Sequence, residues 1–524
     1  MMMEEYIISI DQSTQGTKAL LFNHEGKLLK RTDIPHKQII SKAGWISHDP
    51  EEIYSNTIYV VKKLIEESGI DRKKVIGIGI SNQRETSLAW HRKTGKPFGH
   101  AIVWQCARAH DICTEIESAN KGDMVREHTG IPLSPYFPAS KYAWILKNIP
   151  EAKKEMEKGN LCFGTIDSWL IYRLTAGRYH KTDFSNASRT QLFDIFDLQW
   201  DSELCDLFGI SIDAMPQACS SNDKFGQTDL EGCLPHPIPI HGVLGDSHGA
   251  LFGQGCLEKG MIKTTYGTGS SIMMNIGEKP FLSEHGIVTS LAWEIDGKIN
   301  YVLEGNLNYT GAVITWLKED LGLIDSAAET EALADKAIKA DGLYLVPAFT
   351  GLGAPYWNSH ATAMITGMTR NTGKNEIVRG GLECIAYQIC DIIQAMYQDT
   401  GILPEGLRVD GGPTRNKYIM QFQSDILGMP VLVSGMEELS GTGAAWMAGM
   451  AMGLFGKNVY NNVKRIRYQP HMVEAVRKEK YDGWKRAVYT SLKQTEIPIG
   501  FESLLGNKLD DRRTRGLLEK SNTL

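Results

Sequence analysis

The chain has 524 residues, 42% of them hydrophobic, and a formal net charge of −6. This length exceeds what one core usually supports and predicts two domains of roughly 250 residues each. Lysine and arginine form no basic block in any segment. Because nucleic acids and membrane surfaces attract basic patches, the composition argues against both as partners.

The sequence carries no sign of export or membrane insertion. It starts MMMEEYIISIDQ, without a basic region ahead of an apolar core, which is typical of a strand rather than of a signal peptide. No window approaches the roughly 18 apolar residues that a membrane span needs. The nine cysteines are scattered without a CxxC pair, as in proteins of the reducing cytosol. We therefore expect a cytoplasmic protein.

Strand-like and helix-like segments alternate along the chain, which predicts an α/β fold. Short apolar runs predict strands at Tyr6–Ile10, Ala19–Asn23, Val75–Ile80, Leu343–Pro347 and Leu407–Val409. Longer amphipathic runs predict helices at Glu51–Glu67, Pro138–Lys147, Asn375–Thr400 and Gly443–Gly453. The final stretch, Leu504–Leu524, is highly charged and poor in aromatic residues, so we expect a surface helix or a frayed tail there.

Two small polar turns each connect a pair of predicted strands. Asp11–Thr17 joins the first two strands, and Tyr266–Ser271 joins Gly260–Thr265 to Ile272–Asn275. Two hairpins of the same pattern, one in each half of the chain, predict an internal duplication. The boundary between the halves is expected near Gly253–Leu257.

Both turns have the chemistry of a phosphate-binding loop. Glycine and small polar residues let backbone amides approach phosphate oxygens, and Thr14 and Thr268 add hydroxyl groups at the two tips. Asp11 ends the first strand at such a tip, where a carboxylate can hold Mg²⁺. For either turn alone an ordinary hairpin is the stronger interpretation, and only the pair favours a phosphate site.

A double glycine follows a later strand, in Val409-Asp410-Gly411-Gly412, and Asn416 lies just beyond it. Such glycines allow the backbone to approach a flat ring or a phosphate, and an asparagine can bond a nucleotide. A tight turn leading into a helix explains the same residues equally well.

Asp246 is the candidate catalytic base. It lies between glycine and small residues in Leu244–Ala250, at a predicted strand-to-helix turn that leaves it open to a ligand. Aspartate is also favoured as a helix N-cap, and the two roles are compatible because a helix N-terminus favours negative charge. His248 is the rival base, although histidines are more often structural.

Arg84 and Glu85 follow the predicted strand Val75–Ile80 and form a candidate polyol site. One can donate to vicinal hydroxyl groups and the other can accept from them. A surface ion pair of little energetic consequence is the alternative. Trp104 and Tyr136 are candidate walls of the same pocket, or ordinary core aromatics.

Taken together, these motifs resemble the FGGY carbohydrate kinases, and among them the glycerol kinases. The matching stretches run from residue 6 to about residue 455 and include IDQSTQGTKALLF, GISNQRETSLAW, TDFSNASRTQLFDI, GDSHGALFGQG, TTYGTGSSIMMN, GMTRNTGKNEIVRGGLE and RVDGGPTRNKYIMQFQSDILG. Several are long and rich in rare residues, which makes a chance match negligible.

The resemblance implies two actin-like (ribonuclease H-like) α/β domains with ATP and substrate in the cleft between them. The expected divisions are a sugar-binding domain at 1–253, a nucleotide-binding domain at 254–460, and a helical extension with a charged tail at 461–524. The family also implies the cofactors ATP and Mg²⁺, a small polyol or sugar as substrate, and assembly as a homodimer or homotetramer.

The resemblance also assigns roles to single residues. Asp246 corresponds to the base that accepts the proton of the attacking hydroxyl, and Asp11 to the acid that holds Mg²⁺. The nucleotide-binding positions are Thr14, Gln15, Gly16, Lys18, Gly267, Thr268, Gly311, Gly412 and Asn416. The substrate-binding positions are Arg84, Glu85, Trp104, Tyr136, Asp246, Ser247 and Ser271.

Two substrate positions depart from the glycerol kinases, which usually carry Gln where this chain has Ser247 and Phe where it has Ser271. Two smaller hydroxylic side chains predict a wider pocket and a polyol or ketose of four to six carbons, since one methylene of fit is worth roughly 1–3 kcal/mol. The alternatives are a true glycerol kinase that forms glycerol 3-phosphate, a kinase of a small signalling sugar, and an actin-like ATPase without a sugar substrate.

Overall fold

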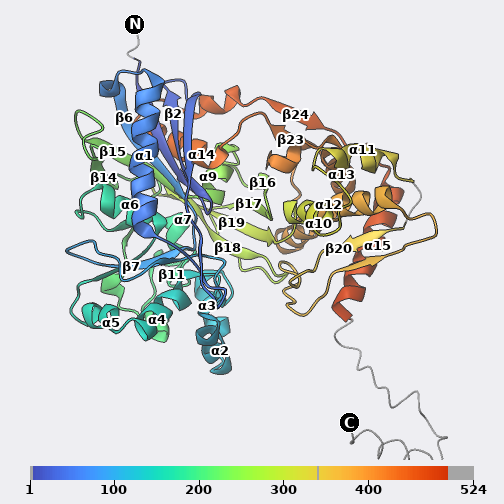
Figure 1. The fold of residues 1–524 in the computed structure, drawn as a ribbon, viewed down its shortest axis with the longest axis horizontal. Coiled ribbons are helices and arrows are strands. Elements are labelled where there is room, and N and C mark those ends of the chain that lie inside the picture. The colour runs from blue at the N-terminus through green and yellow to red at the C-terminus, as the bar shows by residue number, and fades with distance from the viewer. Residues whose placement is uncertain (1–3, 339–341, 494–524) are drawn as a thin grey trace, which may run out of the picture.

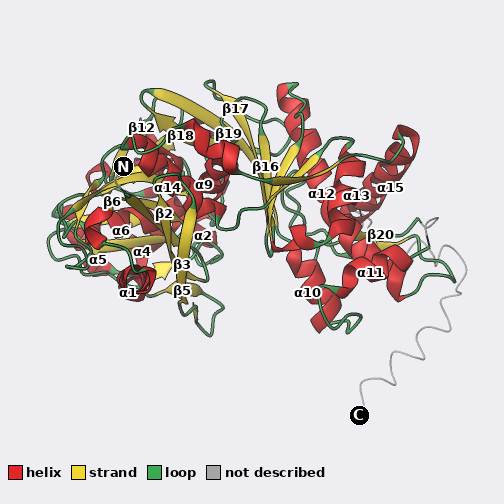
Figure 2. Ribbon diagram, turned by 90° about the horizontal axis from the view of Figure 1, so that it is seen from above, coloured by secondary structure: helices red, strands yellow, loops and turns green. Residues whose placement is uncertain are grey.

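A computed structural model describes residues 4–338 and 342–493. Two bodies lie side by side, and the long strands β16 to β19 run between them (Figure 1 and Figure 2). The strands and helices alternate as the sequence predicts, so the α/β class is confirmed. Within the described ranges, none of the helices is long and apolar enough to cross a membrane.

The first body is built on a six-stranded sheet in the order β14-β15-β6-β1-β2-β3. Its strands are β1 (Tyr6–Gln12), β2 (Gly16–Asn23), β3 (Leu28–Pro35), β6 (Val75–Asn82), β14 (Gly226–Thr228) and β15 (Ile238–Gly245). β1 pairs antiparallel with β2 and parallel with β6, and β6 is parallel to β15. All residues of β1 are buried, as expected for a central strand covered on both faces.

The second body contains a seven-stranded sheet in the order β18-β19-β17-β16-β22-β23-β24. Its strands are β16 (Ile262–Tyr266), β17 (Ser270–Gly277), β18 (Val288–Ile295), β19 (Lys298–Leu307), β22 (Leu407–Gly411), β23 (Val431–Ser434) and β24 (Arg465–Tyr468). β16 pairs antiparallel with β17 and parallel with β22, which repeats the pairing of β1 with β2 and β6. The predicted duplication is therefore present in the strand pairing.

Smaller sheets and helices complete the two bodies. A five-stranded sheet has the order β4-β5-β8-β7-β9, with β4 (Ile39–Ile40), β5 (Ile46–His48), β7 (Ser87–His91), β8 (Ala101–Ile102) and β9 (Leu161–Thr165). Three two-stranded sheets pair β10 (Lys181–Asp183) with β13 (Gln217–Cys219), β11 (Phe193–Asp194) with β12 (Gln199–Trp200), and β20 (Tyr344–Val346) with β21 (Met364–Thr366). The α-helices are α1 (Pro50–Ser68), α2 (His110–Ser118), α3 (Gly122–Thr129), α4 (Pro138–Asn148), α5 (Pro150–Glu157), α6 (Ile166–Leu174), α7 (Phe184–Ala187), α8 (Ser202–Phe208), α9 (Asp246–Gly253), α10 (Gly311–Glu319), α11 (Glu329–Lys336), α12 (Lys374–Thr400), α13 (Lys417–Leu427), α14 (Leu439–Ala451) and α15 (Glu474–Lys493).

Local sequence explains where helix α1 begins and ends. The Asp49 side chain caps the helix by accepting from the amide of Glu51, and Pro50 occupies the first turn, where its missing N–H costs nothing. Gly69 ends the helix in the left-handed conformation, at φ 69°, which glycine adopts without strain. These signals place the helix that the sequence predicts at Glu51–Glu67.

Helices α9 and α14 pack against each other between the two sheets. Each follows a parallel strand, α9 after β15 and α14 after β23, so they occupy corresponding places in the two halves. The crossing is close because a Cβ atom on Gly443 would lie 1.9 Å from the carbonyl oxygen of Gly249. α14 also contacts β1, β6 and β15, so a helix from the second half of the sequence lies on the sheet of the first half.

Within residues 4–338 and 342–493, each predicted strand and helix is present, and the observed ends differ from the predicted ones where small residues obscure them. The sequence predicts a helix at Gly443–Gly453, but α14 begins at Leu439, because Gly441 and Gly443 continue the helix instead of ending it. Leu504–Leu524 lies outside the described residues. The domain limits at 253 and 460 stay predictions.

Candidate active site

The first hairpin turn is held by its own backbone and by a tryptophan. The amide of Ser13 donates to the carbonyl of Gly16 at 2.9 Å. Gly16 is required there, since a Cβ atom would lie 2.5 Å from the carbonyl oxygen of Ile34. The Trp104 indole donates from Nε1 to Thr14 Oγ1 at 2.9 Å. The tip therefore contacts one predicted wall of the substrate pocket, while Gln15 is exposed to solvent.

Asp11 and Lys18 face each other across β1 and β2 and belong to one charge cluster. Lys18 Nζ lies 3.7 Å from Asp11 Oδ2 and also pairs with Glu438. Burial raises the pKa of Asp11 to about 6; Lys18 opposes this rise, whereas Glu438 and Asp246 add to it. The negative charges of Glu438 and Asp246 near Asp11 create a place that a hard divalent cation would stabilise, so the donor set fits Mg²⁺.

The second hairpin turn is tied to the start of helix α10. The amide of Gly311 donates to the carbonyl of Gly267 at 3.0 Å, and the amide of Ala312 donates to the carbonyl of Thr268 at 3.0 Å. Gly267 and Thr268 are exposed at the tip. Three residues predicted to bind nucleotide, Gly267, Thr268 and Gly311, are thus brought into direct contact by the fold.

A cavity of about 690 Å³ continues from this point between α10, α12 and α13. Gly311, Gly412 and Asn416 all line it; Gly311 begins α10, whereas Gly412 and Asn416 lie close together in the segment that leads into α13. The Asn416 side chain is engaged by protein: Oδ1 accepts from the amide of Ile419, and Nδ2 donates to Thr330 Oγ1 at 2.9 Å. Asn416 therefore shapes the cavity as the N-cap of α13.

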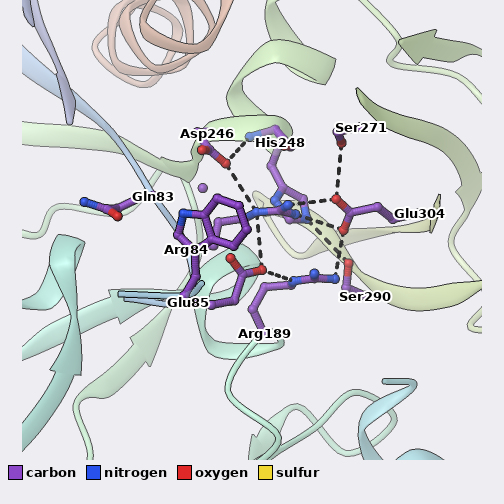
Figure 3. Close-up of polar contacts among 12 residues, drawn as sticks. Gln83, Arg84, Glu85, Arg189, Asp246, His248, Ser271, Ser290 and Glu304 are labelled. Atoms are coloured by element: carbon purple, nitrogen blue, oxygen red, sulfur yellow. Dashed lines mark hydrogen bonds and ion pairs between the residues drawn. The ribbon is translucent and has the colours of Figure 1, made fainter. Parts of the chain in front are cut away.

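The predicted acceptor pocket contains a buried network of ion pairs (Figure 3). Arg84 donates from both terminal nitrogens to Glu304, at 2.7 and 2.9 Å, and its Nε lies 3.3 Å from Asp246 Oδ1. Glu85 accepts from Arg189 Nε at 2.9 Å. Arg84 and Glu85 are only 4% and 2% exposed, which excludes the alternative of a surface ion pair.

Asp246 is the first residue of α9, directly after β15. Gly245 is needed before it, because a Cβ atom would lie 2.5 Å from Cγ of Arg84. The Asp246 side chain retains 37% exposure, so it is held by its neighbours and open to a ligand. Burial raises the pKa of Asp246 and Glu85 adds to this rise, while Arg84 opposes it. An ionised carboxylate at this position can accept a proton from a bound hydroxyl group.

His248 does not share this accessibility. It is fully buried, and Nε2 lies 3.5 Å from Ser290 Oγ. Burial, together with the neighbouring Arg84 and Arg189, holds the pKa of His248 well below its usual value. A neutral, enclosed imidazole of this kind is structural, so Asp246 is the better-placed base.

The predicted acceptor residues include an aromatic pair and a polar group. The ring centroids of Trp104 and Tyr136 lie 5.4 Å apart. In the polar group, Ser271 Oγ donates to Glu304 Oε1 at 3.2 Å, and Lys263 Nζ lies 3.4 Å from the same hydroxyl. Ser247 is half-buried beside Asp246. The two positions with unexpected serines therefore present hydroxyl groups.

Sequence reasoning missed Glu304 and Arg189, which complete the network. Both side chains are 0% exposed. Glu304 is an acid that directly follows the apolar run Tyr301–Leu303. That signal could have identified it, because a buried charge requires a partner. Arg189 lies in a polar segment and carries no comparable signal.

Comparisons with known proteins identify the same family that the sequence motifs resemble. The N-terminal domain of the FGGY family of carbohydrate kinases matches residues 6–253, and the C-terminal domain of that family matches residues 262–452. Glycerol kinase 1 of Thermotoga maritima is 48% identical over 92% of this chain and 99% of that protein. Glycerol kinase of Bacillus subtilis is 43% identical over 94% of this chain and 99% of that protein.

Solved structures give the same result. Plasmodium falciparum glycerol kinase with ADP superposes with a TM-score of 0.88 at 37% identity, covering 93% of this chain and 98% of that chain. Gluconate kinase from Lactobacillus acidophilus has a TM-score of 0.82 at 21% identity, covering 94% of this chain and 98% of that chain, which shows the fold alone. The two actin-like domains are confirmed by these likenesses, and the chain belongs to the FGGY family of carbohydrate kinases.

Proposed function

We propose that this FGGY kinase transfers the γ-phosphoryl group of ATP to a primary hydroxyl group of glycerol, forming glycerol 3-phosphate and ADP. That it is an ATP-dependent phosphotransferase with an alcohol acceptor follows from its family. The proposed transfer to an acceptor hydroxyl is supported by the position of Asp246. Its carboxylate is open to a ligand and lies 3.3 Å from the guanidinium of Arg84. Glycerol is favoured because relatives that are 43–48% identical over nearly the whole chain carry the name glycerol kinase.

In the proposed reaction, Arg84 and Glu85 hold the acceptor hydroxyls, and Trp104 and Tyr136 enclose the carbon chain. Asp246 accepts the proton of the attacking hydroxyl as its oxygen bonds to the γ-phosphorus. The bond from that phosphorus to the β,γ-bridging oxygen breaks, and ADP leaves. The amides of both hairpin turns lie where they can bind phosphate oxygens. Asp11 would hold Mg²⁺, which supplies positive charge to the phosphates when bound.

A larger acceptor is the second candidate. Ser271 directs its hydroxyl toward Glu304 and Lys263, and this polar wall suits an acceptor that has more carbons and more hydroxyl groups than glycerol. The sequence predicts a polyol or ketose of four to six carbons because Ser247 and Ser271 are smaller than the side chains usual at these positions. The relatives favour glycerol more strongly than the two serines favour a longer chain.

ATP consumption with glycerol and with four- to six-carbon polyols and ketoses tests both candidates. The highest kcat/KM on glycerol supports the proposal, and a clear preference for a longer acceptor overturns it. Ser271→Phe adds an apolar wall and should raise the ratio of glycerol activity to longer-acceptor activity about tenfold. An unchanged ratio would contradict the argument from Ser271. ATP hydrolysis that no acceptor stimulates would favour an actin-like ATPase instead.

We also propose a cytoplasmic location and a division of labour between the halves. All nine cysteines are free thiols, and eight are buried, which suits a reducing compartment. The first half carries most of the acceptor residues and the first phosphate-binding turn, and the second half carries the nucleotide cavity and Ser271. A homodimer or homotetramer stays a prediction.

A further inference from the structure

Lys141 is a buried lysine that the proposed chemistry does not use. It lies on α4, directly after the segment that carries Tyr136, and its side chain is 0% exposed. Its Nζ donates to two backbone carbonyl oxygens, that of Glu85 at 3.1 Å and that of Tyr136. Removing an ammonium group from water is costly unless the site makes specific use of its hydrogen bonds.

The two carbonyls belong to separate segments of the acceptor pocket. Glu85 lies between β6 and β7, and its carboxylate binds Arg189. Tyr136 lies just before α4, and its ring contacts Trp104. One ammonium group therefore joins the backbone that carries the polar side of the pocket to the backbone that carries its aromatic side.

We propose that Lys141 is a positioning residue that sets the width of the acceptor pocket by holding the Glu85 and Tyr136 backbones together. The inference rests on the proposed function, since it assigns these two segments to the acceptor. Lys141 touches neither the acceptor nor the phosphates. Its loss should therefore raise the KM for the acceptor and leave the KM for ATP nearly unchanged.

The protonation of Lys141 adds a second readout. Burial lowers the pKa of Lys141 to about 7; Glu85, Cys106 and Cys113 oppose this fall, and Arg108 adds to it. Below that pH an ammonium group makes charge-assisted bonds to the carbonyls. Above it a neutral amine makes weaker ones, by roughly a factor of two. The acceptor KM should therefore rise as the pH increases through about 7.

Two substitutions separate positioning from simple space filling. Lys141→Met keeps the volume and removes every donor, while Lys141→Gln keeps a neutral N–H donor. If Lys141 acts by bridging, we expect the acceptor KM to rise about tenfold in the Met variant and less in the Gln variant. A lysine that only fills space would give the opposite order, because Gln buries an amide and Met does not.

Ser140→Ala is the matched control, because Ser140 is a buried neighbour on the same helix. It should leave both KM values within about twofold of wild type. The acceptor KM of the wild type should rise as the pH increases through about 7. In both Lys141 variants this rise should be absent. Thermal melts identify a variant that does not fold. If Lys141→Met does not fold, the acceptor KM of Lys141→Gln and the pH profile of the wild type test the inference instead.

Several results would overturn the inference. They are an acceptor KM unchanged in Lys141→Met, an equal rise of both KM values, a pH step that persists in the variants, or a flat wild-type profile between pH 6 and 8.5. If the wild type is active and any of these results is found, only the proposed role of Lys141 is overturned. A wild type that phosphorylates none of the acceptors overturns the proposed function and this inference with it.

Discussion

Asp246 shows how the place of a residue at the start of a helix determines its access to a ligand. It is the first residue of helix α9, where a negative charge is favoured, and it remains 37% exposed beside Arg84. The sequence predicts a helix N-cap, a base or both; in the structure Gly245 is the N-cap, and Asp246 at the next position presents its carboxylate to the site.

Asp246→Asn should lower kcat by at least about a hundredfold, because general base catalysis contributes roughly 10²–10⁴. The amide has nearly the same size, so ADP binding should change less than about threefold. Steady-state kinetics and ADP titration measure the two effects. Substantial turnover in this variant would remove Asp246 from the role of base.

The raised pKa of Asp11 predicts that the Mg²⁺ requirement of the activity depends on pH. Its pKa is raised from 3.8 to about 6 by burial, so the carboxylate binds a proton as the pH falls below about 6. A cation must then displace that proton. The Mg²⁺ concentration for half-maximal activity should therefore rise as the pH falls from 7 to 5. Activity measured against Mg²⁺ at each pH checks this, with the Mg²⁺ affinity of ATP in the same buffers as the control. A constant requirement would remove Asp11 from the metal site.

Short motifs predict most of the site residues, but they do not identify Glu304 and Arg189, which complete the network. Arg84, Glu85 and Asp246 lie at strand ends, where a local pattern marks them. Glu304 contributes through Arg84, which lies 220 positions away in the sequence, and through Arg189. No local pattern can show such distant partners. Lys141 looks like an ordinary helix residue until the fold buries it.

At the scale of elements, the hairpins were predictable and the placement of helix α14 was not. Alternating apolar runs around a polar turn specify a hairpin locally. The packing of α14 against α9 depends on glycines that permit close contact between distant backbones. Gly443 and Gly249 look like helix breakers in sequence, although in the structure they allow this crossing.

Gly443→Ala tests that crossing. The new Cβ atom would lie 1.9 Å from the carbonyl oxygen of Gly249 and 3.0 Å from the amide nitrogen of Gly253. Backbone cannot yield as a flexible side chain can, so we expect a loss of about 3 kcal/mol or more and a Tm lowered by about 5 °C or more.

Gly456→Ala is the control for this substitution. The nearest atom to its new Cβ would be Asn458 Oδ1 at 3.5 Å, so the Tm should move by no more than about 2 °C. Equal melting temperatures for the two variants would show that the α9–α14 contact does not limit stability.

At the scale of the whole molecule, the two halves meet through a buried charge. Glu304 is on β19 of the second sheet, whereas Arg84 and Arg189 belong to the first half of the chain. Burial alone would raise the pKa of Glu304, but Arg189 and Arg84 hold it well below its usual range. Glu304 thus shares one negative charge between two guanidinium groups that have little access to water and that also face Asp246 and Glu85. It ties the acceptor side to the nucleotide side.

Glu304→Gln should weaken the ion pairs between the two halves without changing the size of the side chain. Both arginines would lose their shared counter-charge, and breaking a buried ion pair costs about 3–5 kcal/mol. We expect a clearly lower Tm and a higher acceptor KM, because Arg84 loses the group that orients it. A looser contact between the halves would admit water to the site, so the ratio of ATP hydrolysis to phosphoryl transfer should also rise.

Glu437→Gln is the matched control, because Glu437 forms an exposed ion pair with Arg415 at 3.0 Å. Such a pair contributes about 0–1 kcal/mol, so its loss should change neither the Tm nor the hydrolysis ratio appreciably. If Glu304→Gln behaves like this control, the buried network does not couple the halves. A lower Tm with an unchanged hydrolysis ratio would mean that Glu304 stabilises the fold but plays no part in excluding water from the reaction.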